Sequence, residues 1–137
     1  MRTQKYEGYR KLKVYQQAHG LALQIHKMSL ALPKFELYEE GSQIRRSSKS
    51  VSSNIVEGFS LRHYKNEYLR YLSLAYASSQ ETIEHLDYLF ETGSLSDEEL
   101  YSRLHKGYDD LCGMLFKLIQ SVHEKHETKI FDKYTGD

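Results

Sequence analysis

Apolar residues recur every three or four positions along nearly the whole chain, and this spacing restricts the fold more than any other feature of the sequence. An α-helix turns once per 3.6 residues, so the spacing places the apolar side chains on one face of a helix. No segment shows the alternation of apolar and polar residues that is typical of a strand. The pattern predicts an all-α protein whose four helices cover about residues 11–32, 42–57, 62–92 and 96–124.

The breaks between the apolar stripes indicate where each helix ends. Pro33 lacks an amide and disfavours helix in the preceding residue, so it should end the first helix. Gly58 and Gly93 are natural ends of the second and third helices. Ser96 and Glu99 have the spacing of a capping box, which predicts the start of the fourth helix. Short connections of this kind favour an antiparallel up-down-up-down four-helix bundle.

The length of 137 residues suits one domain with a core of its own, which we assign to residues 1–137 with a frayed tail over 125–137. The lone cysteine, Cys112, has no partner for an intramolecular disulfide and should pack as a small hydrophobe. No apolar signal segment follows Met1, and the longest stretch without a charged residue, 14–26, is too short to span a membrane. We therefore expect a cytoplasmic protein with no membrane contact.

Charge divides the chain into two halves of opposite sign, although the net charge is zero. Residues 1–70 hold 13 Lys and Arg against 6 Asp and Glu, while residues 71–137 hold 6 against 13. The division favours basic helices packed beside acidic ones, within a chain or between subunits. It also leaves room for a basic face, whereas neutrality of the whole opposes strong attraction to nucleic acid.

Motifs that carry catalysis or cofactor binding are missing from the sequence. It has no glycine-rich phosphate loop, no HExxH and no pair of CxxC motifs. No glutamate precedes a histidine by three residues, the spacing that di-iron sites in helical bundles require. His85 beside Glu81 and Glu84 is interpreted as a surface helix pair, and His123 with His126 as a solvated helix end. We expect no enzymatic activity, metal or cofactor.

Two groups of basic residues are candidates for nucleic-acid contact. Arg45, Arg46 and Lys49 lie within about one turn of the second helix and should be compensated by carboxylates of the later helices or, alternatively, by phosphate. The second group interleaves cations and tyrosines at helical spacing: Arg62, Tyr64, Lys65, Tyr68, Arg70 and Tyr71. The tyrosines favour a core or a subunit interface, with base stacking as the alternative.

Small and polar residues give the second helix an unusual surface. Gln43, Asn54 and Glu57 form a polar strip with several of its serines, which predicts hydrogen bonding against another helix or another subunit, with solvent exposure as the alternative. Its many small side chains should let another helix come close. Gly20, in the middle of the first helix, predicts a second close approach.

The segment 43–58, which reads QIRRSSKSVSSNIVEG, resembles the signature of a four-helix bundle family that includes proteins encoded in intervening sequences of bacterial 23S ribosomal RNA genes. Residues 9–18 resemble the opening of that family, and Leu32-Pro33-Lys34 is similar to its Phe-Pro-Lys. The third helix matches the family pattern at several positions: Glu67, Tyr68, Leu72, Ala75 and Ser79. The sequence departs from the family at Glu39, Glu40, Ser47, Ser48 and Val56.

The resemblance implies a homopentameric ring without established catalysis. A related branch, the accessory proteins of diversity-generating retroelements, implies a basic barrel that binds a reverse transcriptase and nucleic acid. On that comparison Arg45 and Arg46 are the candidate basic contacts, and Asn54 and Glu57 a structural polar pair. We therefore expect an oligomeric module that scaffolds a protein or ribonucleoprotein partner, with direct RNA or DNA binding by the basic half as the alternative.

Overall fold

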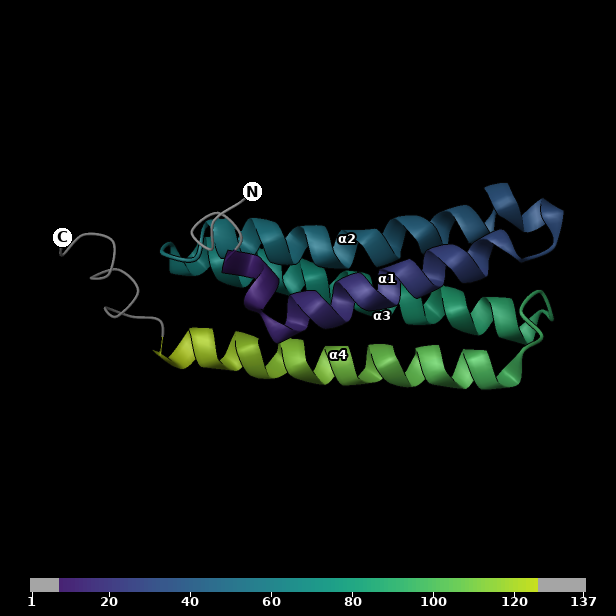
Figure 1. Ribbon diagram of the computed structural model, residues 1–137. Coiled ribbons are helices and arrows are strands. Elements are labelled where there is room, and N and C mark those ends of the chain that lie inside the picture. The colour runs from purple at the N-terminus through teal and green to yellow at the C-terminus, as the bar shows by residue number, and fades with distance from the viewer. Residues whose placement is uncertain (1–7, 126–137) are drawn as a thin grey trace.

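The computed structural model describes residues 8–125, and within them it places four α-helices and two short 3-10 helices. The elements follow in the order η1 (Gly8–Lys11), α1 (Lys13–Leu30), η2 (Lys34–Tyr38), α2 (Glu40–Ser60), α3 (Lys65–Glu91) and α4 (Glu98–Lys125). Consecutive helices run in opposite directions and lie along one another (Figure 1). The prediction of an all-α four-helix bundle is confirmed.

The predicted apolar stripes form the core of the bundle. Each helix turns its stripe inward, so that side chains from all four helices are fully enclosed. The largest of these side chains come from every helix: Ile25, Ile44, Ile55, Leu72, Leu86, Leu89, Leu104, Tyr108, Leu111 and Leu115. Burial of this kind is the main source of stability in a bundle, because helix propensity alone is marginal.

Two of the predicted helix ends are confirmed and two are wrong. α1 ends before Pro33, and Gly93 follows α3 with φ of +86°, a conformation that favours glycine. Gly58, in contrast, lies inside α2, which continues to Ser60. The cap of α4 is one residue later than predicted, because the Asp97 carboxylate accepts a hydrogen bond of 3.0 Å from the Leu100 amide.

The α2–α3 seam is the most extensive contact between helices in the bundle. Gly58 lets α3 approach closely, since a Cβ added there would lie 3.1 Å from Tyr71 Cβ. Hydroxyl groups meet across the same seam: Ser47 Oγ lies 2.8 Å from Thr82 Oγ1, and Ser50 Oγ lies 3.0 Å from Ser78 Oγ. The prediction that small residues of the second helix bring another helix close is confirmed here.

The end of the bundle that holds η2 is organised by a buried carboxylate. Glu36 is 5% exposed, and its carboxylate accepts hydrogen bonds from Ser94 Oγ at 2.6 Å and from the Glu40 amide at 3.3 Å. Glu36 therefore joins η2 to the start of α2 and to the turn between α3 and α4.

None of the helices between residues 8 and 125 has the length and apolar character that crossing a bilayer requires.

Candidate functional site

A groove runs between α1 and α4, which pack against each other less extensively than α1 packs on α2 or α3 on α4. It consists of two hollows of about 250 and 360 Å³ that share Gln24 and Arg103. We call this feature the α1–α4 groove. Its lining residues are Gln16, Gln17, Gly20, Leu21, Gln24, Lys27, Met28, Ala31, Leu100, Arg103 and Gly107.

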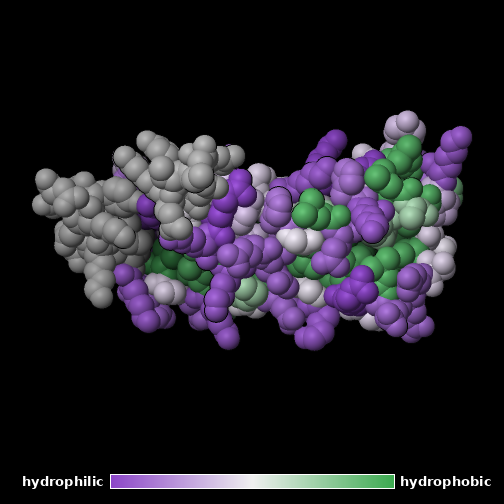
Figure 2. Space-filling model, in the orientation of Figure 1, coloured by the Kyte–Doolittle hydropathy of each residue, from purple (hydrophilic) through white to green (hydrophobic). Residues whose placement is uncertain are grey.

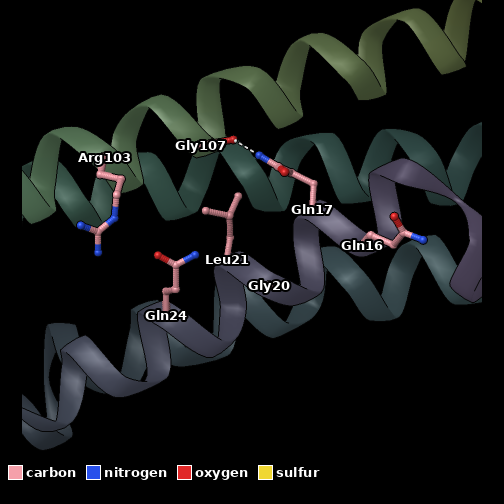
Figure 3. A pocket seen from close by; sticks show the side chains of 7 residues that line it. All are labelled: Gln16, Gln17, Gly20, Leu21, Gln24, Arg103 and Gly107. Carbon is pink, nitrogen blue, oxygen red and sulfur yellow. Dashed lines mark hydrogen bonds between the residues drawn. The ribbon is translucent and has the colours of Figure 1, made fainter.

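Glycines shape the first hollow from both helices (Figure 3). Gly107 is the point of close approach, because a Cβ added there would lie 2.6 Å from Leu21 Cδ2. Gln17 Nε2 donates a hydrogen bond of 3.3 Å to the Gly107 carbonyl across the gap. Gly20 has no atom within 4 Å of an added Cβ, so the close approach predicted for it is wrong. Its missing side chain opens the groove instead.

The groove carries positive charge and no carboxylate among its lining residues. Arg103 and Lys27 line it from opposite helices, and neither forms a hydrogen bond or ion pair within residues 8–125. The second hollow adds an apolar surface made by Met28, Ala31 and Leu100. Chemically, the groove can accommodate an apolar group next to a negative charge.

Large apolar side chains also lie exposed on α1 and η2. Leu23 and Leu30 of α1 are 61% and 58% exposed, and Phe35 and Tyr38 of η2 are 66% and 86% exposed. We call these four residues the apolar row. Figure 2 shows hydrophobic surface on the part of the visible face that lies towards η2. Other large apolar side chains, on α3 and α4 and at the turn before α3, are also exposed: Tyr64, Leu74, Tyr88 and Phe116.

The first group of predicted nucleic-acid contacts separates into one structural and two exposed residues. Arg45 donates hydrogen bonds of 3.0 Å to Ser29 Oγ and 2.7 Å to the Leu37 carbonyl, so it joins α2 to α1 and η2. The carboxylate partners expected for it are therefore replaced by neutral acceptors. Arg46 and Lys49 are exposed on α2 and form no ion pair within the described part of the chain.

The second group lies around the turn between α2 and α3. Arg62 stacks on the Phe59 ring at 3.9 Å and donates to the Phe59 carbonyl, and Lys65 is half-buried. Arg70 is exposed, with its guanidinium 4.8 Å from the Tyr71 ring centre.

The three tyrosines of this group face different surroundings. Tyr68 is buried in the core, and burial raises its pKa, an effect that nearby Arg62 partly opposes. Tyr71 packs against Gly58 in the α2–α3 seam. Tyr64 is half exposed and lies against His63. Tyr68 and Tyr71 therefore support the predicted packing role, and Tyr64 alone offers an open ring.

The residues of the predicted polar strip of α2 also differ from one another in their surroundings. Asn54 Nδ2 donates to the Ser50 carbonyl at 2.9 Å and to Ser50 Oγ at 3.1 Å, and Ser50 itself reaches α3. Asn54 therefore bonds within its own helix, and the hydrogen bond to another helix that was predicted for this strip is made by Ser50. Gln43 and Glu57 are exposed, which matches the alternative of solvent contact.

A histidine that sequence analysis assigned to the surface links two helices. His85 of α3 has a side chain only 14% exposed; its Nδ1 lies 2.6 Å from Glu40 Oε2 of α2, and its Nε2 lies 3.3 Å from Glu81 Oε2. The pair with Glu81 was visible as i,i+4 spacing. The pair with Glu40 spans 45 residues and has no local signal.

A second histidine, His105, lies among carboxylates where α3 meets α4. His105 lies 3.6 Å from Asp87 and 3.1 Å from Asp109, and Tyr101 donates to Asp87 at 2.6 Å. That hydrogen bond, with burial and the surrounding carboxylates, raises the pKa of Tyr101 to about 12.

Cys112 is buried as expected, and burial raises the pKa of its thiol.

No group of three metal-ligating side chains converges within residues 8–125. His123 is exposed at the end of α4, while His126 and the rest of the predicted tail, 126–137, lie outside the described residues. Lys125, which we assigned to the tail, is the last residue of α4.

The geometry defines a helical bundle with a lateral, cationic groove. The chain belongs to the 23S rRNA-intervening sequence protein family, whose model matches residues 10–117. It is also similar to a solved protein of unknown function from the S23 ribosomal protein family of Bacteroides thetaiotaomicron VPI-5482. That likeness has a TM-score of 0.68 at 22% identity, and it covers 78% of this chain and 95% of the other. No curated protein matches the chain.

Proposed function

We propose that the protein is a non-enzymatic module that assembles into a homo-oligomer, as a pentamer, and scaffolds a protein or ribonucleoprotein partner. The observation that carries this proposal is the set of eight large apolar side chains that are exposed between residues 8 and 125. None of them belongs to the buried core, and each leaves 42% or more of its surface exposed. Covering apolar surface is favourable by about 25 cal/mol per Å².

Four of these exposed side chains form the apolar row. Leu23 and Leu30 are seven residues apart and therefore share a face of α1, and Phe35 and Tyr38 continue beyond its end. Exposed apolar side chains that gather on one part of a domain typically mark a site of protein contact. Membership of the intervening-sequence family supports the same proposal, because the resemblance implies a ring.

The mass of the protein in solution tests the proposal. Light scattering after size exclusion should give five times the 16.1 kDa of one chain at micromolar concentration. A constant mass of 16.1 kDa over the accessible concentration range would contradict self-association. Another fixed multiple would retain the oligomer and exclude the pentamer.

Direct nucleic-acid binding is a second candidate, which Arg46 and Lys49 favour because both side chains are exposed and neither is paired within residues 8–125. Structured RNA should then bind with an affinity that falls steeply between two salt concentrations. Arg46→Ala/Lys49→Ala should reduce the salt slope by about one for each phosphate that the variant no longer neutralises. Arg45 is unsuitable for this test because its guanidinium holds η2.

The matched control for this test removes two lysines of α4, Lys106→Ala/Lys117→Ala, and should leave the slope unchanged. If the unmodified protein does not bind the RNA even at low salt, the nucleic-acid candidate is wrong.

A further inference from the structure

The α1–α4 groove has the character of a receptor for an acidic, partly apolar surface. Its two cations, Lys27 and Arg103, are unpaired within residues 8–125, and they flank the apolar hollow of Met28, Ala31 and Leu100. Glu99 lies one turn before Arg103 on the same helix, yet the two side chains form no ion pair. The positive charge is therefore available to a partner.

The chain presents a matching surface on the outside of α3. Glu84, Tyr88 and Glu91 follow at i, i+4 and i+7 and so share one face of that helix. Both glutamates are exposed, and Tyr88 is 52% exposed. We call these three residues the acidic stripe. It combines an aromatic ring with a carboxylate on either side, which is the complement of the groove.

The acidic stripe cannot reach the groove of its own chain. α3 packs on α2 and α4 and lies diagonally across the bundle from α1, with the stripe on its solvent side. Only another molecule can bring the two surfaces together.

We infer that a second copy of this chain docks its acidic stripe in the α1–α4 groove. Tyr88 of one copy covers the apolar hollow, and the carboxylates of Glu84 and Glu91 pair with Lys27 and Arg103. The spacing supports this arrangement, since Glu84 and Glu91 are about 10 Å apart along their helix and can flank a ring between them. This inference rests on the proposed self-association and names the two surfaces that would produce it.

The contact has a consequence for the form of the assembly. Groove and stripe are different surfaces, so each copy offers one of each, and the contact is heterologous. A heterologous contact with a suitable rotation closes into a ring, whereas a two-fold dimer requires the same patch on both subunits. The inferred contact is thus compatible with an odd number of subunits.

Charge reversal on each side tests the inference on the whole chain. Lys27→Glu/Arg103→Glu should raise the concentration at which half of the protein is assembled by about tenfold or more, because like charges then face each other across the interface. Glu84→Lys/Glu91→Lys should do the same from the other side. The variant that carries all four reversals restores opposite charges at every contact and should assemble again.

Controls separate this interface from general effects of charge. Lys106→Glu/Lys117→Glu makes the same change of charge on exposed positions of α4 outside the groove and should keep the wild-type mass. Circular dichroism should show unchanged helix content in every charge variant, since all the altered side chains are exposed. Tyr88→Ala, which changes no charge, should also weaken assembly.

The outcomes distinguish the inference from the proposed function. If wild type assembles and both reversed variants assemble equally well, the groove and the stripe are not the interface, although the oligomer stands. If each reversal dissociates the assembly and the fourfold variant stays dissociated, direct pairing between the two surfaces is contradicted. A wild-type monomer would overturn both proposals.

Discussion

The α2–α3 seam and the α1–α4 groove join helices of the same bundle, yet they differ in what lies between the helices. Across the first, Gly58 and paired hydroxyl groups bring the two backbones close. Across the second, the groove contains glutamines, an open glycine and two cations that have no partner in the described part of the chain. Glycine therefore tightens a contact where a neighbour occupies the space of the missing side chain, as at Gly58 and Gly107, and opens a groove where no neighbour does, as at Gly20.

The strongest test of this comparison replaces Gly58 of the α2–α3 seam by a larger residue. Gly58→Leu should lower the free energy of unfolding by about 1–3 kcal/mol, because the new side chain must displace Tyr68 and Tyr71. Urea denaturation measures the change. Gly113→Leu is the matched control on α4, where an added Cβ meets no atom within 4 Å, and it should not destabilise. Equal losses at both positions would refute the close packing inferred at Gly58.

Removal of a hydroxyl group from the α2–α3 seam should give the next largest loss of stability. Thr82→Val keeps the side-chain shape but removes the group that lies 2.8 Å from Ser47 Oγ, and it should cost about 1 kcal/mol. A double-mutant cycle with Ser47→Ala should show that the two losses are not additive. Strict additivity would mean that the two hydroxyls do not interact, and that each acts only through its own helix.

At the α1–α4 groove a substitution should increase the stability of the fold. Gly20→Ala should raise the free energy of unfolding by about 0.5–1 kcal/mol, since alanine favours helix and the added methyl group meets nothing. Thermal unfolding followed by circular dichroism would record a higher midpoint. A lower midpoint would indicate that Gly20 is packed against a neighbour, and the comparison between the two seams would fail.

The smallest effect is expected for the hydrogen bond that crosses the groove. Gln17→Ala removes the bond of 3.3 Å to the Gly107 carbonyl, which lies in a partly solvated place. The loss should be no more than about 0.5 kcal/mol, because water can replace the amide. Gln16→Ala, which changes a neighbouring glutamine that bonds to the Arg10 carbonyl, is the natural reference. A loss above that of Thr82→Val would contradict the loose character of the groove.

The bundle itself could be predicted from the sequence because helical periodicity states which face of each helix is apolar. It does not state which neighbour a given residue meets. Gly20 and Gly107 lie in helices of the same seam, and nothing local reveals that only Gly107 receives Leu21. The predicted start of α4 was wrong for a related reason. Ser96 and Asp97 are both residues that favour the N-cap position, and the path of the backbone selects Asp97.

The surroundings of the candidate functional residues were less predictable, because their contacts connect segments that are distant in the sequence. Arg45 was expected to meet carboxylates, but its acceptors are a serine hydroxyl and a backbone carbonyl, which charge patterns do not reveal. His85 likewise meets Glu40 across the bundle. The groove could not be inferred at all, since it arises from how far α4 stands from α1, a property of packing rather than of either helix alone.

The buried carboxylate of Glu36 bears on how the chain can be cut, extended or joined to other proteins. It holds two connections at one end of the bundle, the segment before α2 and the turn at Ser94, so an insertion in either would disturb both. The turn over residues 61–64, at the opposite end, has no such link to a second connection through Glu36. Fluorescent labels or tethered domains therefore belong at that opposite end, where they leave the Glu36 network intact.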